Sequence, residues 1–344
     1  MCGIAGFLGS KKIDRNFIDK TLSLMKNRGP DFSKSLEKKI NNDKYVYLLH
    51  SRLSIIDLQE RSNQPFTLDN YTIIFNGEIY NFIELKKKLE KKGIKFKTNS
   101  DTEVLLQTYI LYGEKCVEHF DGMWSFAIFN KKEQKLFLSR DRFAEKPLYY
   151  TIQPEGIYFG SQISFIKSLS NKKFEINKGK INQFLSLGPK PIFKNNETFY
   201  KNIHLLGYSE NLSCNNNLDI KIKKYWTPKF KINKKIKSKE AIEEIKRLLI
   251  DTVKLRIRAD VPVAFCLSGG VDSGSLASIA SKELNNKIKT FSIIDEDLRY
   301  NELENVHKVV NDLNCEHEII HIQKNNFIEN LTDLIKYHDS PVYS

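Results

Sequence analysis

The pattern of apolar residues changes near residue 239 of the 344-residue chain, and this change constrains the fold more than any other feature. Before about residue 205, β-branched and aromatic runs alternate with turn residues, which is typical of short strands. After residue 239, strand-like and helix-like segments alternate. The first pattern predicts a layered α+β domain. The second predicts right-handed βαβ units that build a parallel sheet, as in an α/β Rossmann-like domain.

Two helices and a set of short strands are expected before residue 205. The expected helices are 81–92 and 101–112, and a glycine follows each of them. The expected strands are 45–50, 71–76, 125–130, 135–140, 148–152 and 157–160. The stretch 209–239 is rich in Asn, Lys and Ser, which favours a connector. The expected organisation is a first domain at 2–208, a connector at 209–238 and a second domain at 239–344.

An amphipathic helix is expected to open the second domain, because apolar residues recur at helical spacing over 239–258. The expected strands that follow are 261–267, 289–294 and 317–322, and the expected helices are 273–284, 301–313 and 326–338. Three strands are few for a domain of this kind. The parallel sheet is therefore expected to be incomplete.

The charge and composition exclude several classes of protein. The formal net charge is +13, but the lysines are spread along the chain without interleaved arginine and aromatic residues, so no nucleic-acid partner is expected. The five cysteines are scattered and contain no Cys-x-x-Cys, which argues against a disulfide framework and a cysteine zinc site. No apolar run is long enough to cross a bilayer and the N-terminus lacks a secretory signal, so a cytoplasmic location without membrane contact is expected.

Cys2 follows Met1 directly. If Met1 is removed, one residue carries both a thiol and a free α-amine. A thiol must lose its proton before it becomes a good nucleophile, and an α-amine with a pKa of about 8 is a competent base beside it. A cysteine can also fall at position 2 by chance, so this feature alone does not indicate catalysis.

Further motifs follow Cys2 in order along the chain. They are Arg28–Asp31, Ser51–Asp57, Phe75–Asn81, Ser100–Glu103, Asp121–Ala127 and Arg140–Phe143. This series resembles the class II, or N-terminal-nucleophile, glutamine amidotransferases, and specifically the glutaminase domain of glutamine-dependent asparagine synthetases. The resemblance implies an N-terminal-nucleophile αββα sandwich for the first domain. It also implies that Cys2 attacks the side-chain amide of glutamine, forms a thioester and releases ammonia.

The resemblance implies roles for five more residues. Asn76 through its side-chain NH₂ and Gly77 through its backbone N–H would stabilise the oxyanion, and one such donor is typically worth about 3 kcal/mol. Arg52 would hold the α-carboxylate of glutamine with its planar guanidinium. Glu78 and Asp101 would hold the α-ammonium group.

Simpler roles also fit these residue types. Asn76-Gly77 could form a hairpin turn, Asp101 could cap the following helix and Arg52 could be a surface cation. One position departs from the family pattern, because Ala144 stands where the family has glycine in Arg-Asp-x-x-Gly-x-Lys-Pro. A positive φ at Ala144 would be strained, which concerns the loop geometry and leaves the nucleophile unaffected.

A second candidate site begins at Ser268-Gly269-Gly270-Val271-Asp272-Ser273, which follows an expected strand and opens an expected helix. Small residues let backbone N–H groups converge on an anion at a helix N-terminus. The loop lacks the Gly-Lys-Ser/Thr of triphosphate P-loops and resembles the pyrophosphate-binding loop of the ATP pyrophosphatases. The alternative is a plain turn between a strand and a helix.

This second resemblance implies ATP and Mg²⁺ as cofactors. The residues with implied nucleotide-binding roles are Leu267, Ser268, Gly269, Gly270, Asp272, Ser273 and Ile293. Among them, Asp272 would help to hold Mg²⁺. The segment His317–His321 also matches the zinc-protease pattern His-Glu-x-x-His, but it lies in an expected strand. Its two histidines would then be about 13 Å apart, too far to share one zinc ion.

Taken together, the motifs predict a glutamine-dependent asparagine synthetase that takes glutamine, ATP and aspartate, with a role in asparagine biosynthesis. The family continues to a second phosphate loop, Ser-Gly-x-Gly-x-Asp-Glu, which does not occur in this sequence. The chain is therefore expected to be a fragment, half of a split gene or a truncated paralogue. Its expected macromolecular partner is a second copy or a separately encoded C-terminal half.

Several other functions stay open at this point. The acceptor could be another carboxylate, such as a sugar uronic acid or a peptide precursor, or the chain could have glutaminase activity only. A tRNA-modifying enzyme would use the pyrophosphatase-like loop and the basic surface, but it would leave Cys2 and Asn76-Gly77 without a role. A non-catalytic chain that docks on another subunit is a further alternative.

Overall fold

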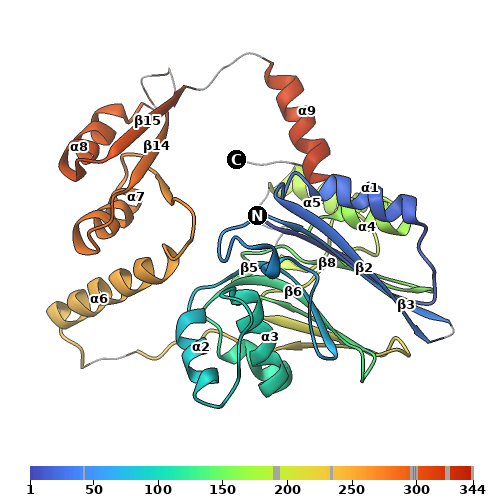
Figure 1. Cartoon of the computed structure of the whole chain (residues 1–344). Coiled ribbons are helices and arrows are strands. Elements are labelled where there is room, and N and C mark those ends of the chain that lie inside the picture. Colours follow the sequence, from blue (N-terminus) through green and yellow to red (C-terminus); the bar gives the residue numbers. More distant parts are fainter. Residues whose placement is uncertain are drawn as a thin grey trace. The chain divides into compact units, whose positions relative to one another are not determined.

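A computed structural model describes residues 1–41, 43–188, 194–232, 235–294, 297, 299, 301–321 and 326–341 of the protein. The chain divides into two compact units (Figure 1). Unit 1 comprises Met1–Pro228 and the segment from Leu331, and unit 2 comprises Lys229–Asn330. Within the described ranges, no helix has both the length and the apolar character needed to cross a membrane.

Unit 1 contains two antiparallel sheets. The first, in spatial order, consists of β10 (His204–Leu205), β8 (Tyr149–Gln153), β9 (Gly156–Gly160), β1 (Gly3–Gly9), β3 (Lys44–Arg52) and β2 (Phe32–Asn41). The second consists of β12 (Ile220–Lys224), β11 (Glu210–Cys214), β7 (Lys135–Arg140), β6 (Gly122–Asn130), β5 (Tyr71–Ile79) and β4 (Phe66–Leu68). The sheets face each other, because Ile4 and Leu8 of β1 share one buried core with Ile74 and Phe129 of the second sheet.

Helices cover the outer faces of both sheets. On the first sheet, α1 (Arg15–Met25) and α4 (Ile163–Ser170) bury Ile18 and Phe165 against Phe7 of β1. On the second sheet, α2 (Phe82–Glu90) and α3 (Asp101–Tyr112) bury apolar residues such as Leu105 against Phe75 of β5. The order of layers is therefore helix, sheet, sheet, helix (Figure 1), which confirms the predicted αββα sandwich. Unit 1 also contains the helical segments α5 (Lys178–Leu187), η1 (Glu60–Ser62) and η2 (Gly113–Glu118).

The structure contains every strand and helix predicted before residue 205, with small shifts at the ends. It also contains elements that were not predicted, namely β1, β2, β4, β10, α1, α4 and α5. The stretch 209–239, expected to be a connector, differs most. Its first part forms β11 and β12, because Leu212 and Cys214 of β11 are buried in the core between the sheets while β11 pairs with β7.

Unit 2 contains a small parallel sheet, which confirms the predicted α/β arrangement. Its strands are β13 (Ala264–Cys266), β14 (Lys289–Ile294) and β15 (Glu316–His321), paired in this order. Its helices are α6 (Ser238–Arg256), α7 (Val271–Ser278) with the π-helical segment η4 (Ile279–Glu283), and α8 (Leu303–Leu313). The last helix, α9 (Phe327–His338), spans the division between the units.

The zinc-protease pattern lies in a strand, as predicted. His317 and His321 both belong to β15, and Nδ1 of His317 is hydrogen-bonded to the hydroxyl of Thr290 at 2.9 Å. Residue 322, the last of the predicted strand, lies outside the described residues. Among the described residues, no group of three or more His, Cys, Asp or Glu side chains could hold a metal ion.

Candidate active site

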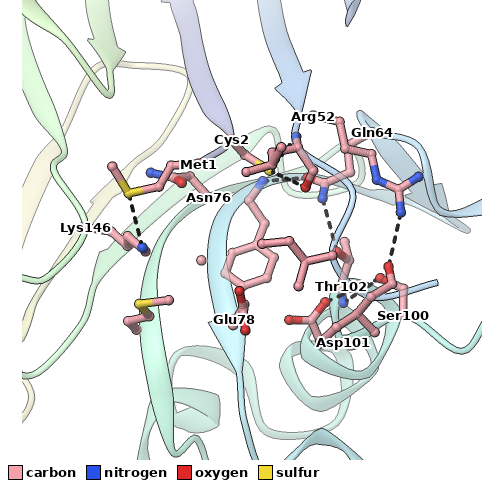
Figure 2. A pocket seen from close by; sticks show the side chains of 16 residues that line it. Met1, Cys2, Arg52, Gln64, Asn76, Glu78, Ser100, Asp101, Thr102 and Lys146 are labelled. Carbon is pink, nitrogen blue, oxygen red and sulfur yellow. Dashed lines mark hydrogen bonds between the residues drawn. The ribbon is translucent and has the colours of Figure 1, made fainter. Parts of the chain in front are cut away.

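One cavity in unit 1 collects all six residues that the sequence assigns to glutamine hydrolysis. It has a volume of about 220 Å³ and is lined by Cys2, Arg52, Asn76, Gly77, Glu78 and Asp101, among others (Figure 2). Cys2 stands at the start of β1 and Arg52 at the end of β3, and these strands pair so that Gly3 lies opposite Ser51. The other four residues come from β5 and from the first turn of α3.

The sulfur of Cys2 is surrounded by protein. Its thiol is 3.6 Å from the carbonyl oxygen of Leu53, and the backbone N–H of Leu53 points back to the sulfur at 3.4 Å. Burial raises the pKa of the Cys2 thiol, so the thiolate needs a base close by. Burial also lowers the pKa of the α-amine of Met1, which favours its neutral, proton-accepting form.

Asn76 and Gly77 lie inside β5, opposite Ser125 and Trp124 of β6, so the alternative of a hairpin turn is wrong. The side-chain nitrogen of Asn76 is 3.4 Å from the hydroxyl of Ser125. The buried amide oxygen has no hydrogen-bond partner among the described residues. Because the two ends of an amide are interchangeable by a flip, one polar end of Asn76 is available at the cavity. A group that hydrogen-bonds to this end would satisfy a buried atom that is otherwise unpaired.

Gly77 is required by the close approach of β5 and β6. A Cβ atom at this position would lie 2.1 Å from the carbonyl oxygen of Met123, which is shorter than any allowed contact. The absence of a side chain therefore lets the backbone of β5 form one wall of the cavity.

Glu78 and Asp101 give the cavity two acidic groups. Burial raises the pKa of Glu78 to about 7 and that of Asp101 to about 6, and the charge of Asp101 adds to the rise at Glu78. Asp101 accepts a hydrogen bond from the backbone N–H of Ile79 at 3.0 Å. The helix cap is Ser100, whose side chain accepts from the backbone N–H of Thr102, so the alternative that Asp101 caps α3 is wrong.

Arg52 is buried rather than a surface cation, so that alternative is also wrong. One terminal nitrogen donates to the carbonyl of Gln59 at 3.1 Å and to the side-chain oxygen of Asn63 at 2.8 Å. The other donates to the carbonyls of Ile56 and Asp57. The guanidinium therefore organises the segment 53–63, here named the cavity loop, in addition to facing the cavity.

The cavity has further lining residues to which the sequence assigned no role. Lys146 is buried beside Met1, with its ammonium nitrogen 3.3 Å from the Met1 sulfur, and burial lowers its pKa. Gln64 accepts from the backbone N–H of Phe75 at 2.6 Å and donates to the hydroxyl of Thr102 at 3.1 Å, so it ties β5 to α3. Lys146 stands in the motif that contains Ala144, which was the available indication of its importance.

The loop with Ala144 has the strained backbone that the sequence analysis considered for a residue other than glycine at this position. Ala144 adopts a φ of 58°, so the residue that replaces the family glycine does occupy the left-handed region. The guanidinium of Arg140 holds the loop, because it donates to the carbonyls of Ala144 at 2.8 Å, Lys146 at 2.6 Å and Leu206 at 2.6 Å.

The second candidate site lies between β13 and α7 of unit 2. Gly269 has a φ of 68°, which lets the chain turn sharply after the strand. The hydroxyl of Ser273 is 3.2 Å from the backbone nitrogen of Ser268 and 3.1 Å from its hydroxyl, so the two serines close the loop on itself. Gly270 is the N-cap residue of α7.

The other residues predicted for this site lie along the same edge of the sheet. Leu267 follows β13 and is buried, and Ile293 is near the end of the adjacent parallel strand β14 with an exposed side chain. The carboxyl ends of parallel strands form the usual ligand edge of such a sheet. Asp272 is exposed in the first turn of α7 and supplies the carboxylate of the loop.

Comparisons with known proteins identify the family of the chain. The family model described as a glutamine amidotransferase domain matches residues 1–226, and the model described as asparagine synthase matches residues 244–344. A Methanocaldococcus jannaschii protein that carries the name of a glutamine-hydrolysing asparagine synthetase is 35% identical, over 99% of this chain and 68% of its own length.

Two further relatives broaden the comparison. Asparagine synthetase [glutamine-hydrolyzing] 1 of Bacillus subtilis is 33% identical, over 99% of this chain and 53% of its own. Amidase chry2 of Gibberella zeae is 30% identical, over 82% of this chain and 43% of its own. The chain thus spans only about half the length of these two relatives. The chain belongs to the family of glutamine-hydrolysing asparagine synthetases, with a class II glutamine amidotransferase domain followed by asparagine synthase sequence.

Proposed function

We propose that unit 1 hydrolyses glutamine to glutamate and ammonia, with Cys2 as the nucleophile. The observation that carries this proposal is the cavity that joins the Cys2 thiol, the Asn76 amide and the carboxyl groups of Glu78 and Asp101. A nucleophile, an oxyanion donor and an acidic subsite for an ammonium group are the three parts that the reaction needs.

The proposed reaction starts with removal of Met1, which leaves the α-amine on Cys2. This amine takes the thiol proton, and the thiolate attacks the side-chain amide carbon of glutamine. Asn76 and the backbone N–H of Gly77 stabilise the oxyanion. The proton passes from the amine to the amide nitrogen, which leaves as ammonia, and a thioester remains on Cys2. Water then adds to the thioester carbon, the sulfur leaves with a proton and glutamate is released.

Charged side chains orient the substrate in this proposal. The α-ammonium group of glutamine lies between Glu78 and Asp101 and favours their ionised forms. Arg52 attracts the α-carboxylate as a buried positive charge while its terminal N–H groups keep the cavity loop in place. Lys146 adds a second positive charge at the cavity wall.

We further propose that the second domain binds ATP at the loop 268–273 and uses it to activate a carboxylate. Asp272 would supply a carboxylate oxygen to Mg²⁺, an ion that prefers oxygen ligands and that would neutralise phosphate charge. The acceptor carboxylate attacks the α-phosphorus of ATP and expels pyrophosphate. Ammonia then attacks the acyl carbon, AMP leaves, and an amide is formed. Aspartate is the proposed acceptor, which gives asparagine.

A second candidate is a synthetase of the same type that takes another carboxylate. It is favoured by the similarity to Amidase chry2, which is named as an amidase and not as an asparagine synthetase. ATP-to-AMP turnover with a panel of carboxylates separates the two candidates, because aspartate alone should support turnover in the first.

The two-site proposal predicts opposite effects for two substitutions. Cys2→Ala should abolish glutamate release and leave ATP binding unchanged, whereas Asp272→Ala should weaken Mg²⁺-dependent ATP binding and leave glutamate release unchanged. Cys315→Ala and Asp251→Ala are the matched controls, since both side chains lie outside the proposed sites. Glutamate release and equilibrium ATP binding are the measurements. Loss of both properties in either variant would contradict two separate sites.

A further inference from the structure

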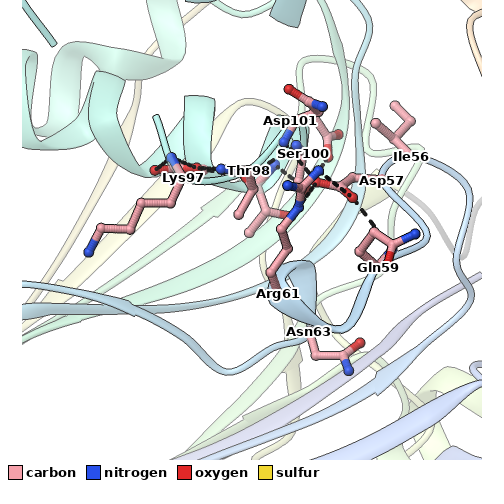
Figure 3. Close-up of polar contacts among 12 residues, drawn as sticks. Ile56, Asp57, Gln59, Arg61, Asn63, Lys97, Thr98, Ser100 and Asp101 are labelled. Carbon is pink, nitrogen blue, oxygen red and sulfur yellow. Dashed lines mark hydrogen bonds and ion pairs between the residues drawn. The ribbon is translucent and has the colours of Figure 1, made fainter. Parts of the chain in front are cut away.

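Two acidic residues close to the cavity have no part in the proposed chemistry. Asp57 lies in the cavity loop, and Glu103 lies in the first turn of α3. Both carboxylates are buried, and both accept hydrogen bonds from the segment 97–100 that leads into α3. Figure 3 shows Asp57 beside this segment. A buried carboxylate is costly unless several donors surround it, so these contacts are specific features of the fold.

The Asp57 carboxylate joins the cavity loop to the segment 97–100. One oxygen accepts from the backbone N–H of Asn99 at 2.7 Å and from the guanidinium of Arg61 at 3.1 Å. The other is 3.4 Å from Arg61 and 3.4 Å from the backbone N–H of Gln59. Burial alone would raise the pKa of Asp57, but the donors from Asn99 and Arg61 hold it below its ordinary value.

Asp57 also has an unusual backbone. Its φ is 48°, in the left-handed region that residues other than glycine rarely adopt. Its carbonyl and that of Ile56 turn inward to accept from the guanidinium of Arg52. The same residue therefore binds Arg52 through its main chain and Asn99 through its side chain.

Glu103 holds the segment 97–100 from the opposite side. Its carboxylate accepts from the backbone N–H groups of Lys97 at 3.0 Å and Thr98 at 2.7 Å, and from the Thr98 hydroxyl at 2.7 Å. The next residue, Asn99, donates to Asp57. The segment is thus fixed to α3 by one carboxylate and to the cavity loop by the other.

The cavity loop and the start of α3, which these contacts connect, line the same cavity. Leu53, Ile55 and Ile56 of the cavity loop line it on one side, and Ser100 and Asp101 line it on another. We infer that Asp57 is a positioning residue for glutamine, which fastens the cavity loop to the segment before α3 and so sets the distance between these walls. This inference rests on the proposed glutaminase function.

Loss of this fastening should affect binding more than chemistry. Without Asp57, the cavity loop is attached to the segment 97–100 in only a fraction of the molecules. Glutamine binding must then also order the loop. The apparent affinity for glutamine is then the intrinsic affinity multiplied by the fraction of molecules in which the loop is attached. The saturated complex still reacts at the ordinary rate. A substitution that only destabilised the fold would instead lower the amount of active protein.

The experiment compares four forms of the full chain. Asp57→Ala removes the carboxylate, and Asp57→Asn keeps the shape and one acceptor without the charge. Asp69→Ala is the matched control, because Asp69 also has a positive φ, of 51°, and is exposed in the turn between β4 and β5. The measurements are kcat and KM for glutamine, the rate of Cys2 alkylation by iodoacetamide from peptide mass mapping, and amide hydrogen exchange at Asn99.

We expect Asp57→Ala to raise KM about tenfold with kcat within about threefold of the wild type. It should also speed alkylation of Cys2 and exchange at Asn99. Asp57→Asn should show the same changes to a smaller extent, and Asp69→Ala should show none of them. The inference would be overturned if Asp57→Ala left KM, the rate of Cys2 alkylation and the rate of exchange at Asn99 unchanged. It would also be overturned if this variant lowered kcat without raising KM.

The alkylation and exchange measurements do not require glutamine turnover. If the wild type releases no glutamate, the proposed glutaminase function fails, while these two rates still show whether Asp57 fastens the loop. If Asp57→Ala does not fold, the smaller changes expected for Asp57→Asn decide the outcome in the same way.

Discussion

Glu78 and Asp101 face the cavity, where burial raises the pKa of Glu78 to about 7 and that of Asp101 to about 6. Both are ionised above these values and attract an ammonium group, and each gains a proton as the pH falls. We therefore predict that kcat/KM for glutamine drops at least about tenfold between pH 8 and about pH 5.5, because this parameter reports the free enzyme.

The variant Glu78→Gln separates this effect from titration of the α-amine. It should lower kcat/KM at high pH and remove the inflection near pH 7, since the group that titrates there is gone. If the pH profile of Glu78→Gln keeps the inflection seen in the wild type, a group other than Glu78 controls it.

His50 gives a prediction for stability. Its ring is completely buried, and its Nε2 donates a hydrogen bond to the carbonyl oxygen of Phe75 at 3.1 Å. Burial lowers the pKa of His50 from 6.5 to about 3. The unfolded chain binds a proton at this residue below about pH 6.5 while the folded chain does not. The free energy of unfolding should therefore fall by about 2 kcal/mol between pH 7 and pH 5 from His50 alone.

Urea unfolding followed by the fluorescence of the buried Trp124 measures this effect. The variant His50→Gln serves as the comparison, because its free energy of unfolding should lack the part of the decrease between pH 7 and pH 5 that comes from His50. Equal slopes of stability against pH in the two proteins would show that His50 is protonated in the folded state.

The site residues that the sequence predicted are those with a distinctive chemical role. Cys2 and Asn76-Gly77 stood out because few other functions need these residue types in this order. Lys146 and Gln64 did not, since each contacts a distant part of the chain: Lys146 contacts Met1, 145 positions away, and Gln64 contacts Thr102, 38 positions away. The fixed guanidinium of Arg52 was equally hidden, because its partners belong to a loop without regular periodicity.

At the level of elements, the Arg140–Tyr150 loop contains a strained backbone position, Ala144, that a glycine should relieve. An alanine in the left-handed region costs about 1 kcal/mol relative to glycine. We predict that Ala144→Gly raises the free energy of unfolding by about 1 kcal/mol, because the φ of Ala144 is 58°. Ala144→Val should lower it, since a β-branched residue is still less suited to this conformation. Urea unfolding of the three proteins is the measurement, and a lower stability of Ala144→Gly would contradict the strain.

The elements that the sequence predicted are those with clear local patterns. Strand β7 and helix α3 have the predicted bounds, because alternation and helix ends are local features. The hairpin of β11 and β12 was missed, since β12 is an exposed edge strand rich in lysine. Its place is set by the pairing of β11 with β7, whose paired residues are 72 to 78 positions earlier in the chain.

For the molecule as a whole, the change of pattern near residue 239 predicted two domains with different sheets. The structure has antiparallel sheets in unit 1 and a parallel sheet in unit 2, and it divides after Pro228. The domain limits 2–208 and 239–344 stay predictions. Sequence patterns indicate where an antiparallel sheet is followed by a parallel sheet. The boundary of a compact unit depends on contacts between distant residues, which local periodicity does not predict.

The central claim is that the α-amine of Cys2 is the base for its own thiol. The most direct test is glutamate release by a chain with a removable N-terminal extension, assayed before and after cleavage that leaves Cys2 first, with the N-terminus verified by mass spectrometry. We predict that cleavage raises the rate at least about a hundredfold, since a positioned base contributes that much or more. Equal rates before and after cleavage would contradict the claim.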